Sequence, residues 1–223
     1  LVYCCITPHI RLVFYVKNQA HKNRIITFAG AFHGRTMGTI SAAAKQKYIE
    51  GFEPVLPGFD NVEFGNIEAV KKAITKNTAG ILIEPIQGEE GVRVSDKKFI
   101  EELRQVCDEN DLLLAFDEVQ CGMGRTGYLF AHEYYDVKPD LISSAKAIAG
   151  GFPLGACLAT ADAASGMTAG VDQYATESGL IKERTTTTTV TDSNPTVSTV
   201  TTQDGSAYSN GGNSISYEST SGY

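Results

Sequence analysis

Short apolar runs that stop at a polar or glycine residue recur through the middle of the chain. The clearest are RIITFAG at Arg24–Gly30, ILIE at residues 81–84 and LLLAF at residues 112–116. A short, continuous run of this kind is typical of a strand that is buried on both faces of a sheet. Two later runs, LISSA before Lys146 and GACLAT at residues 155–160, fit further strands.

Amphipathic helices are predicted between these strands. Asn66 can cap a helix that buries Ile67, Val70 and Ile74 at i, i+3 and i+7. Ser95 or Asp96 can cap the next helix, whose apolar face would consist of Phe99, Leu103, Val106 and Cys107. Strands that alternate with helices predict an α/β fold, with a mostly parallel sheet sandwiched by helices.

The alternating pattern extends over residues 24–170, a length that can bury about two-thirds of its unfolded surface. Residues 1–23 are interpreted as an atypical N-terminal segment, in which LVFYV at residues 12–16 would suit a strand. Residues 171–223 are rich in Thr, Ser, Gly and Asn and contain few large aliphatic side chains. We expect a disordered tail there rather than a strand at TVSTVTT, since little apolar surface is available to offset the entropy of ordering.

Charge and composition exclude several classes of partner. The net charge of −7 argues against nucleic-acid binding, which usually requires a basic face. No apolar run reaches transmembrane length, and the first residues lack the features of a signal peptide. The five cysteines are irregularly spaced, which favours a reducing compartment and a cytoplasmic location.

Two of the predicted strands end in ionisable residues. Asp117 and Glu118 follow the Leu112 run, and Lys146 follows LISSA. Ligands of open α/β sheets bind beyond the carboxyl ends of the strands, so an acid and an amine at these positions could hold a cofactor. A buried ion pair without a ligand would explain the same spacing.

Other chemistries have weaker support. Gly122–Gly127 matches the G-x-G-x-x-G fingerprint of dinucleotide binding, but the two preceding carboxylates would repel a pyrophosphate. No metal site is predicted, because the histidines are dispersed and none has a partner at ligand spacing; they are His9, His21, His33 and His132. The sequence contains no G-x-S-x-G motif, which would have indicated a nucleophilic serine.

Four motifs carry a resemblance to a known family. FAGAFHGRTMG, ILIEPIQGEEGV, LLLAFDEVQCGMGRTG and SAKAIAGGFPLGACLA occur in this order between about Asn23 and Gly170. Together they resemble the class III pyridoxal-phosphate aminotransferases, and most closely the acetylornithine aminotransferase group. The resemblance implies the large-domain core of a fold-type-I transferase, incomplete in this chain, with pyridoxal 5′-phosphate as cofactor.

The resemblance also implies roles for individual residues at the cofactor. Lys146 aligns with the lysine that binds the cofactor covalently, and we expect its amine to lie in a partly desolvated pocket. Asp117 aligns with the acid that keeps the pyridine nitrogen protonated. Val119 and Phe32 would pack on the two faces of the ring, although core packing alone would also suit them. Gln120 would reach the ring hydroxyl.

Three further residues are placed near the site by the same resemblance. Glu118 lies beside the cofactor-binding residues, with a less defined role. Arg35 aligns with the arginine that binds the substrate α-carboxylate, for which a planar guanidinium is suited. Glu89 aligns with the gating glutamate of the ornithine-type enzymes, in a loop that carries a second carboxylate, Glu90, not usual in the family.

The resemblance stops abruptly at both ends. Upstream of RIITF the chain reads LVFYVKNQAHKN, where the family has a segment that binds the cofactor phosphate at a helix N-terminus. After GMTAG it reads VDQYATESGLIKERTTTTT, where the family continues toward its C-terminal substrate domain. We expect a truncated or frame-shifted form of an aminotransferase.

The function expected from the resemblance is transfer of the terminal amino group of N-acetylornithine, or a related ω-amino donor, to 2-oxoglutarate. This reaction belongs to arginine biosynthesis. The family works as a homodimer, so a second copy of the chain is the expected partner, and no nucleic acid or membrane is expected. The alternative is a non-catalytic remnant that binds the cofactor weakly or not at all.

Overall fold

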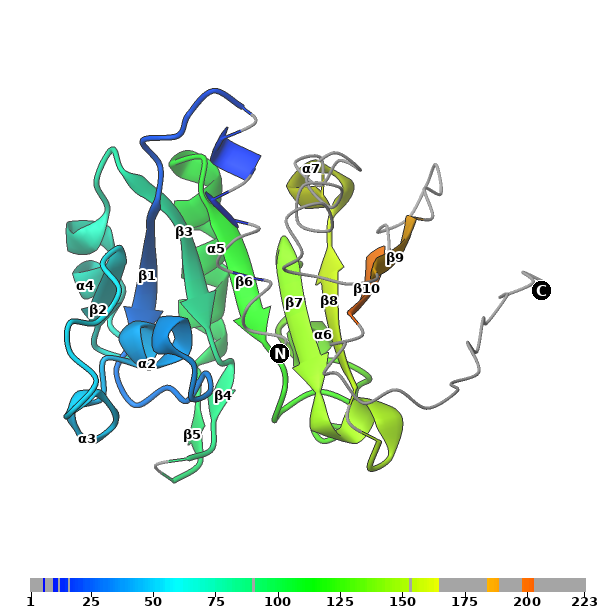
Figure 1. Cartoon of the computed structure of the whole chain (residues 1–223). Helices are drawn as coiled ribbons and strands as arrows, with labels where there is room; N and C mark the ends of the chain where they lie inside the picture. Colours follow the sequence, from blue (N-terminus) through cyan, green and yellow to red (C-terminus); the bar gives the residue numbers. More distant parts are fainter. Residues whose placement is uncertain are drawn as a thin grey trace.

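A six-stranded sheet forms the centre of the molecule. The structure is a computed structural model that describes residues 6, 10–11, 13–15, 17–89, 91–152, 154–164, 184–188 and 198–202. The strand order is β2-β1-β3-β6-β7-β8 (Figure 1). These strands are β1 (Arg24–Phe28), β2 (Phe59–Val62), β3 (Thr78–Ile83), β6 (Leu113–Asp117), β7 (Leu141–Ala145) and β8 (Gly155–Ala159).

The first five strands in this order run parallel, and only β8, at the edge, is antiparallel to its neighbour. The register pairs Ile83 of β3 with Phe116 of β6, and Asp117 of β6 with Ser143 of β7. The carboxyl ends of the parallel strands therefore meet at one edge of the sheet, the lower edge in Figure 1. The predicted α/β class with a mostly parallel sheet is confirmed.

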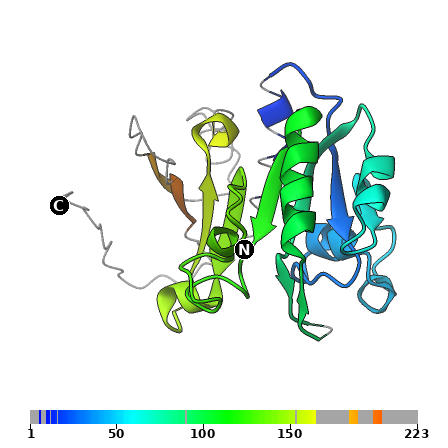
Figure 2. The same cartoon turned by 180° about the vertical axis from the view of Figure 1, so that it is seen from behind.

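Two helices cover one face of the sheet, α4 (Ile67–Ala73) and α5 (Lys97–Glu109), as seen from behind in Figure 2. Both predicted caps are present: the Asn66 side chain accepts a hydrogen bond from the Ala69 amide, and the Asp96 side chain accepts one from the Lys98 amide. Every residue of the predicted apolar face of α5 is buried against the strands. Sequence periodicity thus identified this layer correctly.

The opposite face is covered by the N-terminal segment. Ile6, Ile10, Val13 and Phe14 are buried there against β-strand residues such as Leu82. Their spacing of four, three and one residues is that of one helical stripe, and the described residues 6, 10–11 and 13–15 are helical. The strand suggested for residues 12–16 is therefore wrong at Val13–Tyr15, because a short apolar run does not show the helical spacing of Ile6, Ile10 and Val13.

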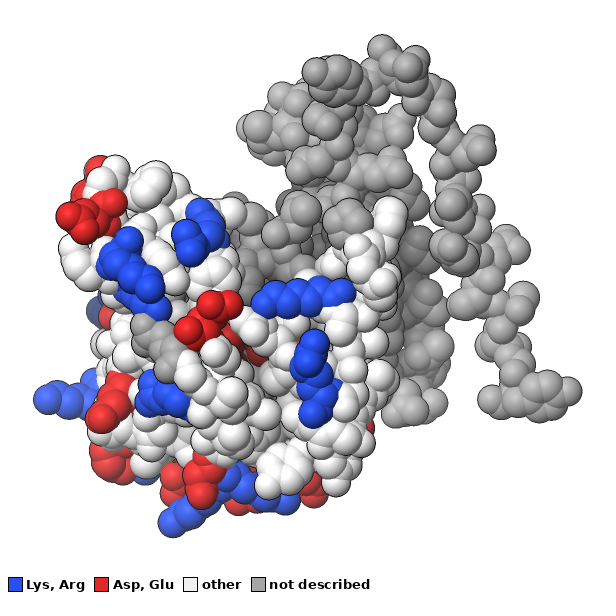
Figure 3. Space-filling view, turned by 90° about the horizontal axis from the view of Figure 1, so that it is seen from below, with Lys and Arg blue, Asp and Glu red and all other residues white. Residues whose placement is uncertain are grey.

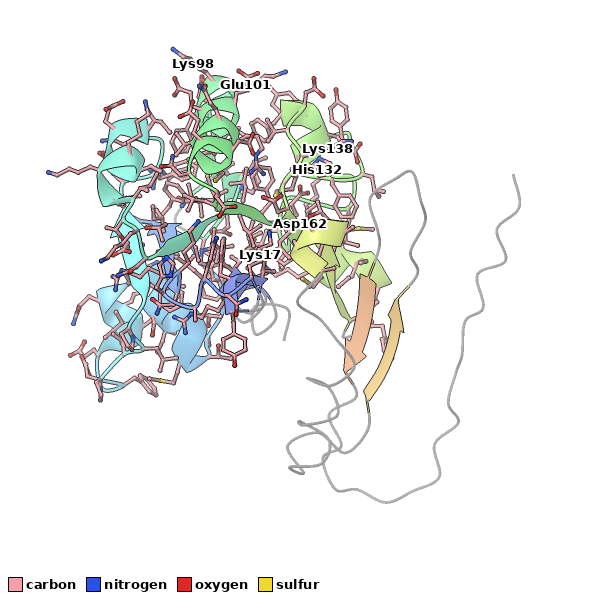
Figure 4. The ribbon with its side chains drawn as sticks, turned by 90° about the horizontal axis from the view of Figure 1, so that it is seen from above. Lys17, Lys98, Glu101, His132, Lys138 and Asp162 are labelled. Atoms are coloured by element: carbon pink, nitrogen blue, oxygen red, sulfur yellow. The ribbon has the colours of Figure 1, made fainter. Side chains whose placement is uncertain are left out.

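An ion pair connects this segment to the far edge of the sheet. Lys17 Nζ lies 2.8 Å from Asp162 Oδ2, in α7 (Ala161–Ala164) after β8, and Figure 4 shows the two side chains together. Both groups are partly exposed to solvent, so the pair contributes little to stability. It joins the end of the N-terminal segment to α7.

The smaller elements lie around the sheet, several of them beyond the carboxyl ends of the strands. Two short strands, β4 (Ile86–Gln87) and β5 (Arg93–Val94), form an antiparallel hairpin after β3. The remaining elements are α2 (Met37–Ala43), α3 (Gln46–Ile49), α6 (Ala131–Tyr135) and the 3₁₀ helix η1 (Lys146–Ala149). In the part of the chain that the structure describes, no helix has the length and apolar character needed to cross a membrane.

Most of the predicted disordered tail lies outside the described residues. Within it, β9 (Arg184–Thr188) and β10 (Ser198–Thr202) form an antiparallel pair. The described part of TVSTVTT, Ser198–Thr202, is the strand β10.

Replacing Leu103 by Ala should lower the free energy of unfolding by about 2–5 kcal/mol, since this side chain is fully buried between α5 and the sheet. Urea denaturation followed by circular dichroism would measure it. Glu101→Ala is the matched control, because Glu101 lies two residues earlier on the exposed side of the same helix. Equal losses in the two variants would contradict the packing described for α5.

Candidate functional site

Three adjacent strands end in ionisable or polar residues at the same edge of the sheet. Because Ile83 pairs with Phe116, the residues that follow, Glu84 and Asp117, lie next to each other, and both are 2% exposed. Asp117 in turn pairs with Ser143 of β7, and Lys146 comes three residues after Ser143. The acid and the amine predicted from the sequence are thus brought to neighbouring strand ends.

The Asp117 carboxylate is held by three groups. Its Oδ1 accepts hydrogen bonds from the Val119 amide at 3.0 Å and from the Ser143 hydroxyl at 3.2 Å. Its Oδ2 is hydrogen-bonded to Nδ1 of His33 at 3.1 Å. Contacts to two distant segments and to the turn that follows β6 fix the orientation of this side chain.

Burial alters the protonation of both members of the His33–Asp117 contact. It raises the pKa of Asp117 to about 7, against the lowering effect of the hydrogen bonds from Val119 and Ser143. It lowers the pKa of His33 to about 3. The distance alone would qualify as an ion pair. Because the imidazole is neutral, the contact is a hydrogen bond, and His33 provides no positive charge to Asp117.

Glu84 adds a second buried carboxylate. Its Oε2 accepts a hydrogen bond from the Phe32 amide at 2.8 Å, and burial raises its pKa to about 7. Ligand atoms of His33, Glu84 and Asp117 all lie within 4.8 Å of one another, a grouping that could also hold a metal ion. The sequence argument against a metal, based on dispersed histidines, therefore does not apply to His33, which the fold brings to two carboxylates.

Lys146 begins η1 directly after β7, with a left-handed φ of 54°. Its side chain is exposed, so the described residues do not remove its amine from water as the sequence led us to expect. Figure 3 looks onto the carboxyl ends of the parallel strands and shows Lys and Arg side chains around a smaller acidic group.

Phe32 and Arg35 come together around a residue that the sequence did not single out. The ring of Tyr48 lies edge-on to the ring of Phe32, with centroids 6.0 Å apart. The Arg35 guanidinium lies over the Tyr48 ring at 4.3 Å and over the Phe32 ring at 5.7 Å. Cation–π contacts of this kind restrain an otherwise exposed arginine.

Gln120 and Glu89 are also brought together. Gln120 Nε2 donates a hydrogen bond to Glu89 Oε1 at 3.1 Å, so the loop after β6 contacts the loop after β4. A Cβ added to Gly88 would lie 3.1 Å from Gln120 Oε1. A larger residue at position 88 would therefore require the Gln120 side chain to move by a few tenths of an ångström.

Glu118 has a different environment from the other predicted residues. Its two oxygens accept hydrogen bonds from the amides of Ala131 and His132, at the start of α6. The structure thus brings Glu118 to a helix N-terminus, where a carboxylate is stabilised by the helix dipole. Val119, the next residue, is half-buried, and its amide donates to Asp117.

The Gly122–Gly127 loop does not have the geometry of a dinucleotide fingerprint. It consists of turns, and the next helix, α6, begins only at Ala131. The amides at the start of that helix already bind Glu118. A Cβ at Gly122 would lie 2.8 Å from the Glu118 carbonyl oxygen, so this glycine serves close packing.

Sequence reasoning missed His33, Ser143, Tyr48 and the role of Glu84. Glu84 could have been found, because it ends a buried strand as Asp117 does. The others depend on contacts between distant segments: His33 meets Asp117 across 84 residues, and Ser143 meets it across 26.

Comparison with known proteins gives a consistent result. A family profile described as "Aminotransferase class-III" matches residues 9–177. The acetylornithine aminotransferase of Agrobacterium fabrum is 61% identical over 167 residues, which cover 75% of this chain and 42% of that enzyme. The acetylornithine aminotransferase of Methanocaldococcus jannaschii is 51% identical over 146 residues, covering 66% of this chain and 37% of that enzyme.

Solved structures show the same similarity. Two structures of the Toxoplasma gondii ornithine aminotransferase are each 28% identical with a TM-score of 0.70, covering 75% of this chain and 40% of theirs. One of them has PLP at partial occupancy in its active site. An (S)-enantioselective ω-transaminase from Thermomicrobium roseum is 29% identical with a TM-score of 0.69, covering 72% of this chain and 41% of that one.

The chain therefore spans about two-fifths of the length of these relatives. The matched range, 9–177, is wider than the core of residues 24–170 predicted from the motifs. It includes most of the N-terminal residues that pack on the sheet.

In the cofactor-free chain, Asp117→Asn should change how stability depends on pH. The folded-state pKa of about 7 lies above the ordinary 3.8, so the folded state binds more protons between these values and Asp117 lowers stability as pH rises through this window. Relative to wild type, the variant should gain a few kcal/mol of unfolding free energy from about pH 4 to about pH 7, since each pKa unit is worth about 1.4 kcal/mol. Urea titrations at several pH values would measure this gain. Parallel pH profiles for the two proteins would refute the assignment.

Proposed function

We propose that this chain, which belongs to the class III aminotransferases, forms the cofactor-binding core of a pyridoxal-phosphate-dependent aminotransferase. The observation that carries the proposal is the buried, pre-oriented Asp117 at the strand end next to the one that delivers Lys146. The names of the relatives support acetylornithine as the donor. Related ω-amino compounds as alternative donors, and 2-oxoglutarate as the amino acceptor, are part of the proposal and follow from the family resemblance alone.

The residues present fit this cofactor. Asp117 is an acid whose pKa is raised by burial to about 7, and a protonated pyridine nitrogen is a cation that would favour its charged form. When bound, pyridoxal phosphate supplies the electron sink for charge that develops on the substrate carbon. Asp117 would hold the proton at the ring nitrogen, and His33, Ser143 and the Val119 amide would hold Asp117 in place.

Lys146 would provide both attachment and proton transfer. Its amine would bind the cofactor covalently, and after release it would move a proton to or from the substrate carbon as a general base and acid. Lys146 is exposed, so its amine is accessible to a ligand from solvent. Phe32 and Val119 would contact the two faces of the cofactor ring, and Gln120 its hydroxyl. Glu118, whose carboxylate is bound at the start of α6, would act from outside the group of residues that contact the ring.

Arg35 and Glu89 would select the substrate. The Arg35 guanidinium, restrained over Tyr48, would bind a substrate carboxylate through two parallel hydrogen bonds. Glu89 is exposed at the same surface and hydrogen-bonded to Gln120, so it can respond to a substrate that displaces Gln120. These two residues would give the site its preference for an amino acid with a second charged or polar group.

We further propose that two copies of the chain associate and that the protein acts in the cytoplasm. Phe152 and Leu154, just after η1, are 72% and 42% exposed beside the proposed site, and a second subunit would bury them. Cys107 and Cys121 are buried thiols outside any disulfide, which fits a reducing compartment.

Incubation with pyridoxal phosphate followed by borohydride reduction should label Lys146, because the site directs its amine to the cofactor. Peptide mass spectrometry would locate the adduct. Lys146→Ala should lose it, whereas Lys138→Ala, which removes an exposed lysine on another part of the surface, should keep it (Figure 4). Labelling scattered over surface lysines, or no labelling, would favour the non-catalytic alternative, a chain that folds but does not hold the cofactor.

A further inference from the structure

Tyr48 contacts two predicted site residues, Phe32 and Arg35, although the family resemblance implies no role for it. Resting on the proposed function, we infer that Tyr48 is a positioning residue: its ring holds the Arg35 guanidinium in the place where this group binds a substrate carboxylate. Tyr48 itself would touch neither the substrate nor the cofactor, and would act through Arg35.

The backbone around α2 brings Tyr48 and Arg35 together. Arg35 directly precedes Thr36, the N-cap of α2, whose side chain accepts a hydrogen bond from the Thr39 amide. At the other end of α2, Ala44 adopts a left-handed φ of 52°, and α3 follows with Tyr48 in it. Both helices lie at the lower edge of the sheet in Figure 1. The turn at Ala44 thus lets a ring from α3 contact the residue that precedes α2.

The Tyr48 ring is itself supported by other parts of the site. It lies edge-on to the Phe32 ring, with centroids 6.0 Å apart, an arrangement that aromatic pairs prefer. The Phe32 amide is in turn bound to the buried Glu84 carboxylate at the end of β3. The Tyr48 amide donates to the Lys45 carbonyl oxygen at 2.8 Å, at the start of α3. The position of the ring is therefore fixed from two sides.

Arg35 depends on this ring for its own position. Its Cζ atom lies 4.3 Å from the centre of the Tyr48 ring and 5.7 Å from that of Phe32, so Tyr48 makes the closer contact. Among the described residues, none forms a hydrogen bond or an ion pair with Arg35. An exposed arginine without a restraint must be ordered when a ligand binds, which weakens binding. A guanidinium over a ring is ordered in advance and can keep its in-plane N–H groups for a carboxylate.

Two lysines share the Tyr48 ring but are not equivalent to Arg35. Lys45 Nζ and Lys47 Nζ lie 5.0 Å and 5.1 Å from the ring centre, farther than Arg35 Cζ. An ammonium group cannot bind a carboxylate through two parallel hydrogen bonds, as a guanidinium can. The lysines instead add positive charge around the ring, which favours an anionic ligand. The arrangement therefore fits a carboxylate that binds to Arg35.

Glutarate is a suitable probe, because this dicarboxylate has no amine or keto group and cannot react with the cofactor or with Lys146. NMR titration of the whole 223-residue chain, followed at the Thr36 amide, would give its dissociation constant. Tyr48→Leu removes the ring but keeps an apolar side chain. It should weaken glutarate binding about two- to five-fold, the range for one cation–π contact at an exposed site. Tyr48→Phe keeps the ring and should bind glutarate as wild type does.

Two controls separate the ring contact from general charge. Lys47→Gln removes an exposed cation near the same ring and should weaken glutarate binding less than Tyr48→Leu does. In an Arg35→Gln background, Tyr48→Leu should have no further effect, because the ring acts only through the arginine. Circular dichroism would verify that each variant is folded.

A measurement without ligand tests the same contact. The Arg35 Nε–Hε signal can be identified by its absence in Arg35→Gln. The ring current of Tyr48 should displace this signal upfield in wild type and in Tyr48→Phe, and the displacement should fall in Tyr48→Leu.

The outcomes are distinguishable. Weaker glutarate binding in Tyr48→Leu, wild-type binding in Tyr48→Phe and no further loss in the Arg35→Gln background would support the inference. Unchanged binding in Tyr48→Leu, equal losses in Tyr48→Leu and Lys47→Gln, or a wild-type chain that does not bind glutarate would overturn it. If Tyr48→Leu does not fold, a wild-type Arg35 signal that is not displaced from its position in the urea-unfolded chain would still contradict it. None of these measurements uses the cofactor, so a failure of pyridoxal phosphate to label Lys146 would count against the proposed function alone.

Discussion

The removal of Asp117 from water at the end of β6 is the constraint on which the rest of the site depends. Burial raises the pKa of this carboxyl to about 7 even though three neighbouring groups hydrogen-bond to it. His33 offers no compensating charge, because the same burial keeps its imidazole neutral. The fold thus holds a buried acid in a fixed orientation, and a cation bound beside it would favour its charged form, which is the property that a pyridinium-binding site requires.

The parallel sheet explains why the other groups gather around this acid. Strands that run in the same direction place their last residues at one edge, so Glu84, Asp117 and the turn to Lys146 become neighbours although they are far apart in the chain. The loop that carries Phe32 and Arg35 is attached to this edge through the Glu84 carboxylate. One backbone arrangement therefore positions the acid, the amine and the arginine together.

Much of this could be predicted from the sequence, because it depends on local patterns. The buried run before Asp117 and the caps Asn66 and Asp96 are short-range signals, and the structure confirms them. The partnership of His33 with Asp117 and the attachment of Glu118 to α6 depend on contacts across distant segments, which no local pattern reveals. The exposure of Lys146 could not be predicted either. Its motif gives the neighbouring residues along the chain, but exposure depends on which other segments pack around the lysine.

The central claim is that Asp117 holds a proton on the ring nitrogen of a bound pyridoxal phosphate. The most direct test is nitrogen NMR of the chain loaded with cofactor that is isotope-labelled at the ring nitrogen. The account predicts a protonated ring nitrogen at neutral pH in the wild-type chain and an unprotonated one in Asp117→Asn. The same protonation state in both proteins would contradict it.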